Sequence, residues 1–246
     1  MLGLGTDITS SSYVSMDLKD ATTDLELWLK NGVGITSDES NRVSKWEDSS
    51  GNDNHATQGS TGDMALLSGG GLDFELSDGD HYDLESAITI AENGGFCFAA
   101  VLNIESHSGD NTLLSKDSND QIRITSDSAF RFRANNPSDT STTFVFESNT
   151  FPTATKLLVL LNRSAGASNR FTLFKNGIQL TPNVDSSTAE AEGENPNGFD
   201  INVIGAKAGT ANFFDGKILE LAFWSKGLSA QEITDVNDYL KSVHGL

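Results

Sequence analysis

Residues Phe213–Glu232 read FFDGKILELAFWSKGLSAQE and predict a strand that passes directly into the last helix. The segment Ile218–Trp224 is a β-prone apolar run interrupted by the polar Glu220. Ser229, followed three residues later by Glu232, forms a capping box and marks the start of a helix. Most of the remaining chain predicts short strands and turns.

Patterns on either side extend this interpretation. Apolar residues recur at helical spacing after the capping box and predict one packed helix face: Ile233, Val236, Leu240 and Val243. Gly245 follows as the C-terminal cap. The stretch Phe96–Ile104 is apolar on both faces of an extended chain, which predicts a central strand buried on both sides. The dipeptide Asn-Gly within Lys175–Ile178 predicts a tight hairpin.

Composition favours one mostly β domain. The chain has 246 residues, of which 37% are hydrophobic, so it can bury a full core. It contains 23 Gly but only 4 Pro, and its many turn residues suit a series of short strands. The sequence therefore predicts an all-β antiparallel sandwich over residues 24–246, with one short C-terminal helix.

Residues 1–23 predict an extended N-terminal arm, because neither helical nor strand periodicity is sustained there. Some of its apolar residues alternate with polar ones: Val14, Met16 and Leu18. Two interpretations stay open. The arm could add a strand to the sheet of another subunit, or it could be a loose terminus.

The acidic net charge of the chain limits the classes of partner it can bind. The chain has 16 basic and 35 acidic residues and a net charge of −19, which disfavours nucleic acids and anionic membranes, because phosphates need clustered Lys and Arg. Solubility is the main consequence of this charge. Locally, Arg131 and Arg133 alternate with Phe130 and Phe132 and give one cationic face. That face is either solvated or meets an anionic partner.

Targeting signals and disulfides are not predicted. Cys97 is the lone cysteine and lies in an apolar stretch, which is typical of an inert core thiol. No basic residue precedes Lys19, and no long apolar segment follows it. Neither a secretion signal nor a transmembrane helix is expected, unless processing has already removed one.

Several segments, in their order along the chain, resemble the laminin-G-like, concanavalin-A-like jelly-roll superfamily. They are Leu25–Leu29, Trp46–Asn52, Gly71–Phe74, Phe96–Phe98, Leu173–Gly177 and Phe214–Glu220. The final Leu228–Glu232, with Tyr239 and Leu240, resembles the short helix that closes many such domains. The resemblance implies a jelly-roll sandwich. It does not fix the function, since such domains serve as lectins, enzyme appendages, adhesion modules and virion proteins.

The arm and its opening Gly3–Asp7 resemble those of structural proteins of tailed phages. A lectin-like domain usually works outside cells, whereas this chain starts at Met1 without an export signal. Particles assembled in the host cytoplasm and released by lysis would reconcile these two facts. A cytoplasmic bacterial protein, or a chain from which an export signal has been trimmed, would reconcile them too. The resemblance implies a virion surface protein, such as a capsid decoration or fibre-like component. Its arm would bind other virion proteins or copies of itself.

Catalytic residues are not predicted. Glycoside hydrolases of this fold use closely spaced carboxylates on one strand, and no strand here carries that motif. Glu190, Glu192 and Glu194 alternate, but within a polar loop. Glu220 stands alone and is expected to make a structural hydrogen bond. The histidines lack zinc-ligand spacing: His55, His81, His107 and His244. A non-enzymatic protein is expected, with a glycoside hydrolase or lyase as the second alternative.

Calcium is the ion that the polar loops would suit, since Asp and Asn offer hard oxygen ligands. The resemblance implies a calcium site near Asp48, Asn52 and Asp53, with Asp215 as a partner from the last strand. A weaker acidic cluster comprises Asp78, Asp80 and Asp83. The other interpretation is that these residues only form turns.

A carbohydrate-binding adhesin or receptor-binding tail protein is the first alternative function, with cell-surface glycans as partners. Such a site needs exposed aromatic rings beside polar groups, because sugars stack their apolar faces and hydrogen-bond through hydroxyls. The nominal candidates are Tyr82, Phe151, Phe199 and Phe213. Each could equally belong to the core or to a strand end.

Overall fold

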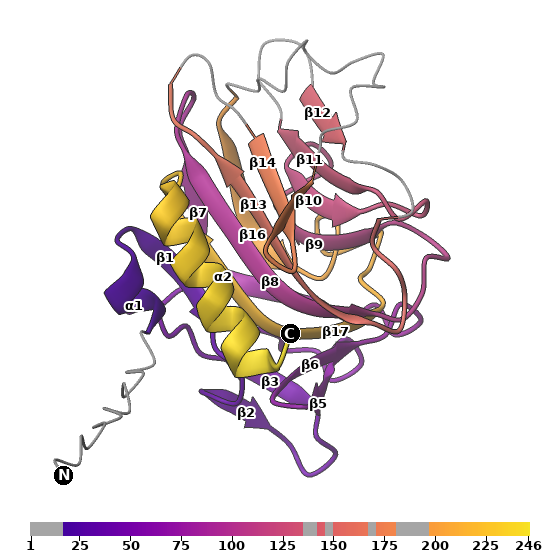
Figure 1. Cartoon of the computed structure of the whole chain (residues 1–246). Coiled ribbons are helices and arrows are strands. Elements are labelled where there is room, and N and C mark those ends of the chain that lie inside the picture. Colours follow the sequence, from indigo (N-terminus) through magenta and orange to yellow (C-terminus); the bar gives the residue numbers. More distant parts are fainter. Residues whose placement is uncertain (1–16, 135–141, 146–149, 167–170, 181–196) are drawn as a thin grey trace, which may run out of the picture.

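In the computed structural model, two antiparallel sheets face each other across a shared core (Figure 1). The structure describes residues 17–134, 142–145, 150–166, 171–180 and 197–246. Sheet A has the order β15 (Ile178–Leu180), β14 (Phe171–Lys175), β13 (Lys156–Arg163), β8 (Phe96–Ile104), β17 (Gly216–Trp224), β6 (Gly71–Phe74) and β5 (Leu66–Ser68), with β1 (Leu25–Leu29) also beside β17. Sheet B has the order β12 (Thr142–Val145), β11 (Phe130–Ala134), β10 (Gln121–Ile124), β9 (Asn111–Ser115), β16 (Phe199–Ile204), β7 (Tyr82–Ile90), β4 (Ala56–Thr57), β3 (Val43–Trp46) and β2 (Ile35–Ser37).

The predicted central strand is confirmed as β8, which lies between β13 and β17 in sheet A. Every second residue from Phe96 to Ile104 enters the core between the sheets. The intervening Cys97, Ala99 and Val101 pack in a second apolar cluster on the outer face. Burial raises the pKa of the Cys97 thiol, and the nearby Glu232 adds to the shift, as expected of an inert core thiol.

β17 has β8 on one side and two strands in turn on the other. β6 pairs with Gly216–Ile218, and β1 pairs with Leu221–Trp224. The register with β8 shifts between Ile218 and Glu220, so a β-bulge places one extra residue in β17. Leu221 thereby returns to the core, while Glu220 stays on the outer face of sheet A.

α2 (Ala230–His244) confirms the predicted terminal helix. The hydroxyl of Ser229 accepts from the N–H of Glu232 at 3.3 Å, and the Glu232 carboxylate accepts from the N–H of Ser229 at 2.8 Å. Gly245 ends the helix with a φ of 63°, in the left-handed region. α2 crosses the outer face of sheet A and packs on its apolar cluster (Figure 1). Val243, which was expected on the packed face, is instead 50% exposed.

The predicted hairpin joins β14 to β15. Asn176 and Gly177 have φ angles of 52° and 80°, as a type I′ turn requires. The Asn176 side chain accepts a hydrogen bond from the N–H of Leu158 at 2.8 Å, which ties the turn to β13. A local sequence signal therefore sets this edge of sheet A.

The N-terminal end of the described chain corrects the predicted arm. Asp17 caps the short helix α1 (Leu18–Ala21), and Leu18 is fully buried beside α2. The indole N–H of Trp224 donates to the Thr22 hydroxyl at 2.7 Å. Residues 17–23 thus pack on the domain, and the predicted boundary at residue 24 is too late. Residues 1–16 of the predicted arm lie outside the described residues.

The described chain is an all-β antiparallel sandwich with one short C-terminal helix, as predicted. Both described helices lie on the outer face of sheet A. The outer face of sheet B is covered by neither of them. Over the described residues, no helix has the length and apolar character needed to cross a membrane.

Candidate functional site

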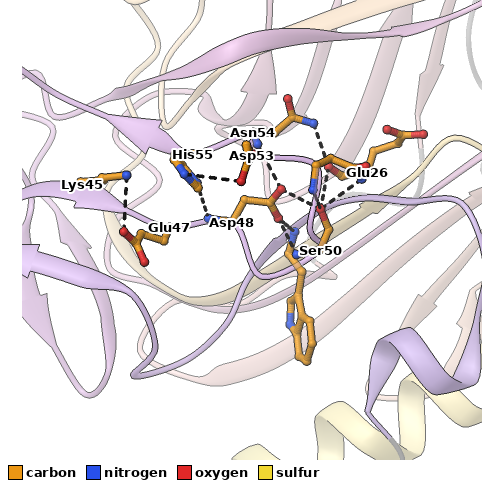
Figure 2. A network of polar contacts seen from close by, with 10 residues as sticks. Glu26, Lys45, Glu47, Asp48, Ser50, Asp53, Asn54 and His55 are labelled. Carbon is orange, nitrogen blue, oxygen red and sulfur yellow. Dashed lines mark hydrogen bonds and ion pairs between the residues drawn. The ribbon is translucent and has the colours of Figure 1, made fainter.

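Asp48 follows β3 and is the centre of a polar network (Figure 2). Its Oδ1 accepts hydrogen bonds from the backbone N–H groups of Trp28 and Ser50, both at 2.8 Å. Its Oδ2 accepts from the Ser50 hydroxyl at 2.6 Å and from the N–H of Asn54 at 3.1 Å. A carboxylate has about four acceptor positions, and these donors occupy them. Asp48 therefore ties its loop to β1.

Asn52 and Asp53 lie in the same loop but make no hydrogen bond to Asp48 among the described contacts. The Asn52 amide donates to the carbonyl of Leu25 at 2.7 Å. Asp53 has a φ of 58° and a side chain that is 87% exposed, 4.0 Å from Nε2 of His55. The interpretation of these residues as turn formers accounts for their contacts.

Asp215 lies far from this loop. Its N–H donates to Oδ1 of Asn111 at 2.8 Å. Asp48 bridges to Leu29, which in turn pairs with Leu221 of β17. The distance from Leu221 back to Asp215 is about 20 Å along an extended strand. The four predicted calcium ligands are therefore not brought together, and calcium binding by this chain stays a prediction.

The second predicted acidic cluster is also divided. Asp80 is 2% exposed, and its Oδ2 accepts from the N–H of Glu75 at 2.8 Å, which holds the loop between β6 and β7. Burial raises the pKa of Asp80 to about 6, and Asp78 and Glu75 add to the shift. Asp78 and Asp83 are exposed, the latter on β7.

A group of carboxylates that sequence reasoning missed lies on the outer face of sheet A. Oxygen atoms of Asp73, Glu75 and Glu105 all lie within 4.8 Å of one another. The ammonium of Lys217 is 2.9 Å from Asp73 and 3.9 Å from Glu105. Burial and the neighbouring Asp73 raise the pKa of Glu75. Lys217 thus already supplies a cation to this group, through a cross-strand register that the sequence does not reveal.

The carboxylates considered for catalysis have structural roles or lie elsewhere. Glu220 is fully buried and accepts a hydrogen bond from the indole N–H of Trp28 at 2.8 Å, so its predicted structural bond is confirmed. Glu190, Glu192 and Glu194 fall outside the described residues.

The outer face of sheet B carries a row of polar side chains. Thr112 of β9, Arg123 of β10 and Arg131 of β11 are successive cross-strand partners. Arg133 lies two positions along from Arg131 and shares its face. Arg123 forms an ion pair with Asp110 at 3.0 Å. Burial lowers the pKa of Arg123, and the two other arginines contribute to that lowering. The cationic face predicted at Arg131 and Arg133 thus includes Arg123, whose position depended on strand pairing.

Some hydrogen-bonding atoms on this face are buried and lack a partner among the described residues. They are Oγ1 of Thr112, Nε of Arg123, Nε of Arg131 and Oδ1 of Asn202 in β16. Buried polar atoms usually have hydrogen-bond partners. This face therefore has bonding capacity that the described chain does not use.

The four aromatic residues considered for sugar stacking differ in exposure. Tyr82, Phe151 and Phe199 are buried, and the Tyr82 hydroxyl donates to the carbonyl of Val43 at 2.7 Å. Phe213 is half-buried in the loop before β17, with its ring centroid 6.1 Å from that of His81. Of the four rings, only that of Phe213 is accessible for stacking.

A family model described as the concanavalin A-like lectin/glucanases superfamily matches residues 76–234. No curated protein matches the chain. Trypanosoma rangeli sialidase in complex with sialic acid aligns with a TM-score of 0.56 and 15% identity, over 90% of this chain and 33% of the sialidase. The same sialidase in complex with 2,3-difluoro-KDN gives the same values.

The chain thus spans about a third of the sialidase's length. At 15% identity, the structural alignment shows a shared fold and nothing more. Ruminococcus gnavus IT-sialidase CBM40 bound to alpha2,3 sialyllactose is 18% identical over 60% of this chain and 83% of its own. Its TM-score of 0.43 is too low to indicate the same topology.

Proposed function

We propose that this chain, which belongs to the concanavalin A-like lectin/glucanases superfamily, is a non-catalytic carbohydrate-binding module with its ligand on the outer face of sheet B. The supporting observation is that polar side chains gather on this face and that two of them, Arg131 and Asn202, are half-buried and so remain within reach of a ligand. Sugar hydroxyls both donate and accept hydrogen bonds, so a few convergent polar groups can orient them. Much of the outer face of sheet A, by contrast, is covered by α1 and α2.

Catalysis is the less favoured alternative because of the surroundings of the close carboxylates. A glycosidase needs one carboxyl group as acid and a second as nucleophile or base. At Asp73, Glu75 and Glu105 the Lys217 ammonium already pairs with two of the three side chains. Turnover of a polysaccharide by the protein, abolished by Glu75→Gln, would overturn the non-catalytic proposal.

A virion role remains a separate proposal, carried by the resemblance of the N-terminal arm. In that form the module sits on a particle surface as a decoration, fibre-like or receptor-binding component. Co-sedimentation of the protein with assembled particles tests it, and a protein found free in every fraction contradicts it.

Binding to a panel of immobilised glycans, with calcium and with EDTA, tests the carbohydrate proposal. We expect specific binding to at least one glycan. Asn202→Ala should weaken that binding several-fold, because it removes a half-buried amide side chain from sheet B. Thr172→Ala is the matched control, since Thr172 has an unpartnered hydroxyl oxygen in sheet A. The proposal fails if no glycan binds, or if both variants weaken binding equally.

A further inference from the structure

Arginine is concentrated on the outer face of sheet B. The chain has a net charge of −19 and only six arginines, and three of these, Arg123, Arg131 and Arg133, share this face. Arg123 and Arg131 are direct cross-strand partners. Like charges placed opposite each other destabilise a sheet, so stability alone does not account for the arrangement.

The three guanidinium groups differ in what they contact. Arg123 is paired with Asp110 at 3.0 Å and donates to Oε1 of Gln121 at 3.1 Å. Arg133 donates to the carbonyl of Ser118 at 3.1 Å. Arg131 is half-buried and makes no hydrogen bond or ion pair with any described residue. Its guanidinium is therefore uncommitted while its two neighbours are held in place.

An uncommitted guanidinium beside two others is suited to one ligand chemistry. Its planar array of donors matches the two oxygens of a carboxylate or sulfate, which it can bind through two parallel hydrogen bonds. Arg133 adds a guanidinium to the same face, whereas the charge of Arg123 is partly offset by its ion pair with Asp110. A long, densely charged nucleic acid is disfavoured, because the rest of this acidic surface repels it. A sugar that carries separate acidic groups avoids most of that repulsion.

We propose that Arg131, flanked by Arg123 and Arg133, binds the carboxylate or sulfate group of an acidic glycan. This inference rests on the proposed function, in that it names the class of sugar bound by the same face. Arg131 supplies the paired hydrogen bonds.

Binding measurements with the full chain test this inference. The probes are polygalacturonate for carboxylates, carrageenan for sulfates, dextran as a neutral glycan, and poly-L-glutamate as a polyanion without sugar. Arg131→Gln should weaken binding to the preferred acidic glycan at least 10-fold, because a hydrogen-bonded ionic contact is lost. The affinity of Arg131→Lys should lie between those of the parent and Arg131→Gln, since lysine keeps the charge but not the paired donors.

Lys19→Gln is the control, because it removes the same charge from the exposed surface of α1. The affinity of Lys19→Gln for the acidic glycan should stay within about 2-fold of that of the parent, as expected for a remote screened charge. Thermal unfolding supplies an independent readout. If Arg131 serves a ligand, Arg131→Gln should be at least as stable as the parent, because it relieves repulsion with Arg123. A marked loss of stability would instead assign Arg131 to the fold and overturn the inference.

The remaining outcomes separate the two proposals. If the protein binds neutral glycans and Arg131→Gln leaves that binding unchanged, the carbohydrate proposal stands and the anion site is overturned. Equal Arg131-dependent binding to poly-L-glutamate overturns the assignment to a sugar. The absence of binding to every glycan overturns both. A preference for polygalacturonate or for carrageenan identifies whether the site takes a carboxylate or a sulfate.

Discussion

Nε2 of His244 lies 2.8 Å from Oε2 of Glu220, and both side chains are buried between α2 and sheet A. The second oxygen of Glu220 accepts the indole N–H of Trp28 at 2.8 Å. The carboxylate thus joins the last turn of α2 to two neighbouring strands, β17 and β1. This contact depends on the bulge in β17, which directs Glu220 outward beneath the helix.

We expect Glu220→Ala to lower the free energy of unfolding by about 2–4 kcal/mol, because it leaves buried polar groups of Trp28 and His244 without a partner. Urea denaturation followed by far-ultraviolet circular dichroism measures the change. Glu85→Ala is the control, since Glu85 is exposed on β7, and it should change stability by less than about 0.5 kcal/mol. Equal effects of the two substitutions would contradict a role for Glu220 in anchoring α2.

Features encoded within a few residues could be predicted from the sequence. The two-sided apolarity of Phe96–Ile104, the Asn176-Gly177 turn and the capping box from Ser229 to Glu232 each depend on local spacing and backbone preference. Residues 17–23 were misassigned because their partners, such as Trp224, lie about 200 positions away in the sequence.

The candidate site was harder to predict, because it is built by pairing between strands. Arg131 and Arg133 could be placed on one face from alternation alone. Arg123 joins them only through the register of β10 with β11, and Lys217 meets Asp73 through that of β17 with β6. The role of Asp48 was equally hidden, since one of its donors is the backbone N–H of Trp28 in another strand.

Asp48→Ala should lower the free energy of unfolding by about 2–4 kcal/mol, because it removes the acceptor for several buried donors. The loss should be the same in EDTA and in calcium, since hydrogen bonds occupy the carboxylate. Chemical denaturation under both conditions measures it, with Asp53→Ala as the exposed control. A loss seen only when calcium is present would identify Asp48 as a metal ligand and contradict the structural role.

Asp80 should make the stability of the fold depend on pH. Its pKa rises from 3.8 to about 6 on folding, so between these values the native state binds more protons than the unfolded state. The contribution of Asp80 to stability therefore falls as pH rises from about 4 to 6. Asp80→Asn should raise the free energy of unfolding by roughly 1–3 kcal/mol at pH 7 and by little at pH 4. Asp83 is exposed on β7, so Asp83→Asn should not change the free energy of unfolding in this pH-dependent way. Matching pH profiles of stability for the two variants would contradict the role given to Asp80.

Thr22→Val should lower the free energy of unfolding by about 1–3 kcal/mol, because it removes the acceptor of the buried Trp224 indole N–H. Thr23→Val, at the adjacent exposed position, is the control. Truncation gives a second test. Deleting residues 1–23 removes Leu18 and Thr22 and should be clearly destabilising, whereas deleting residues 1–16 removes none of the described contacts. If the longer deletion were as stable as the parent, residues 17–23 would belong to a separable arm after all.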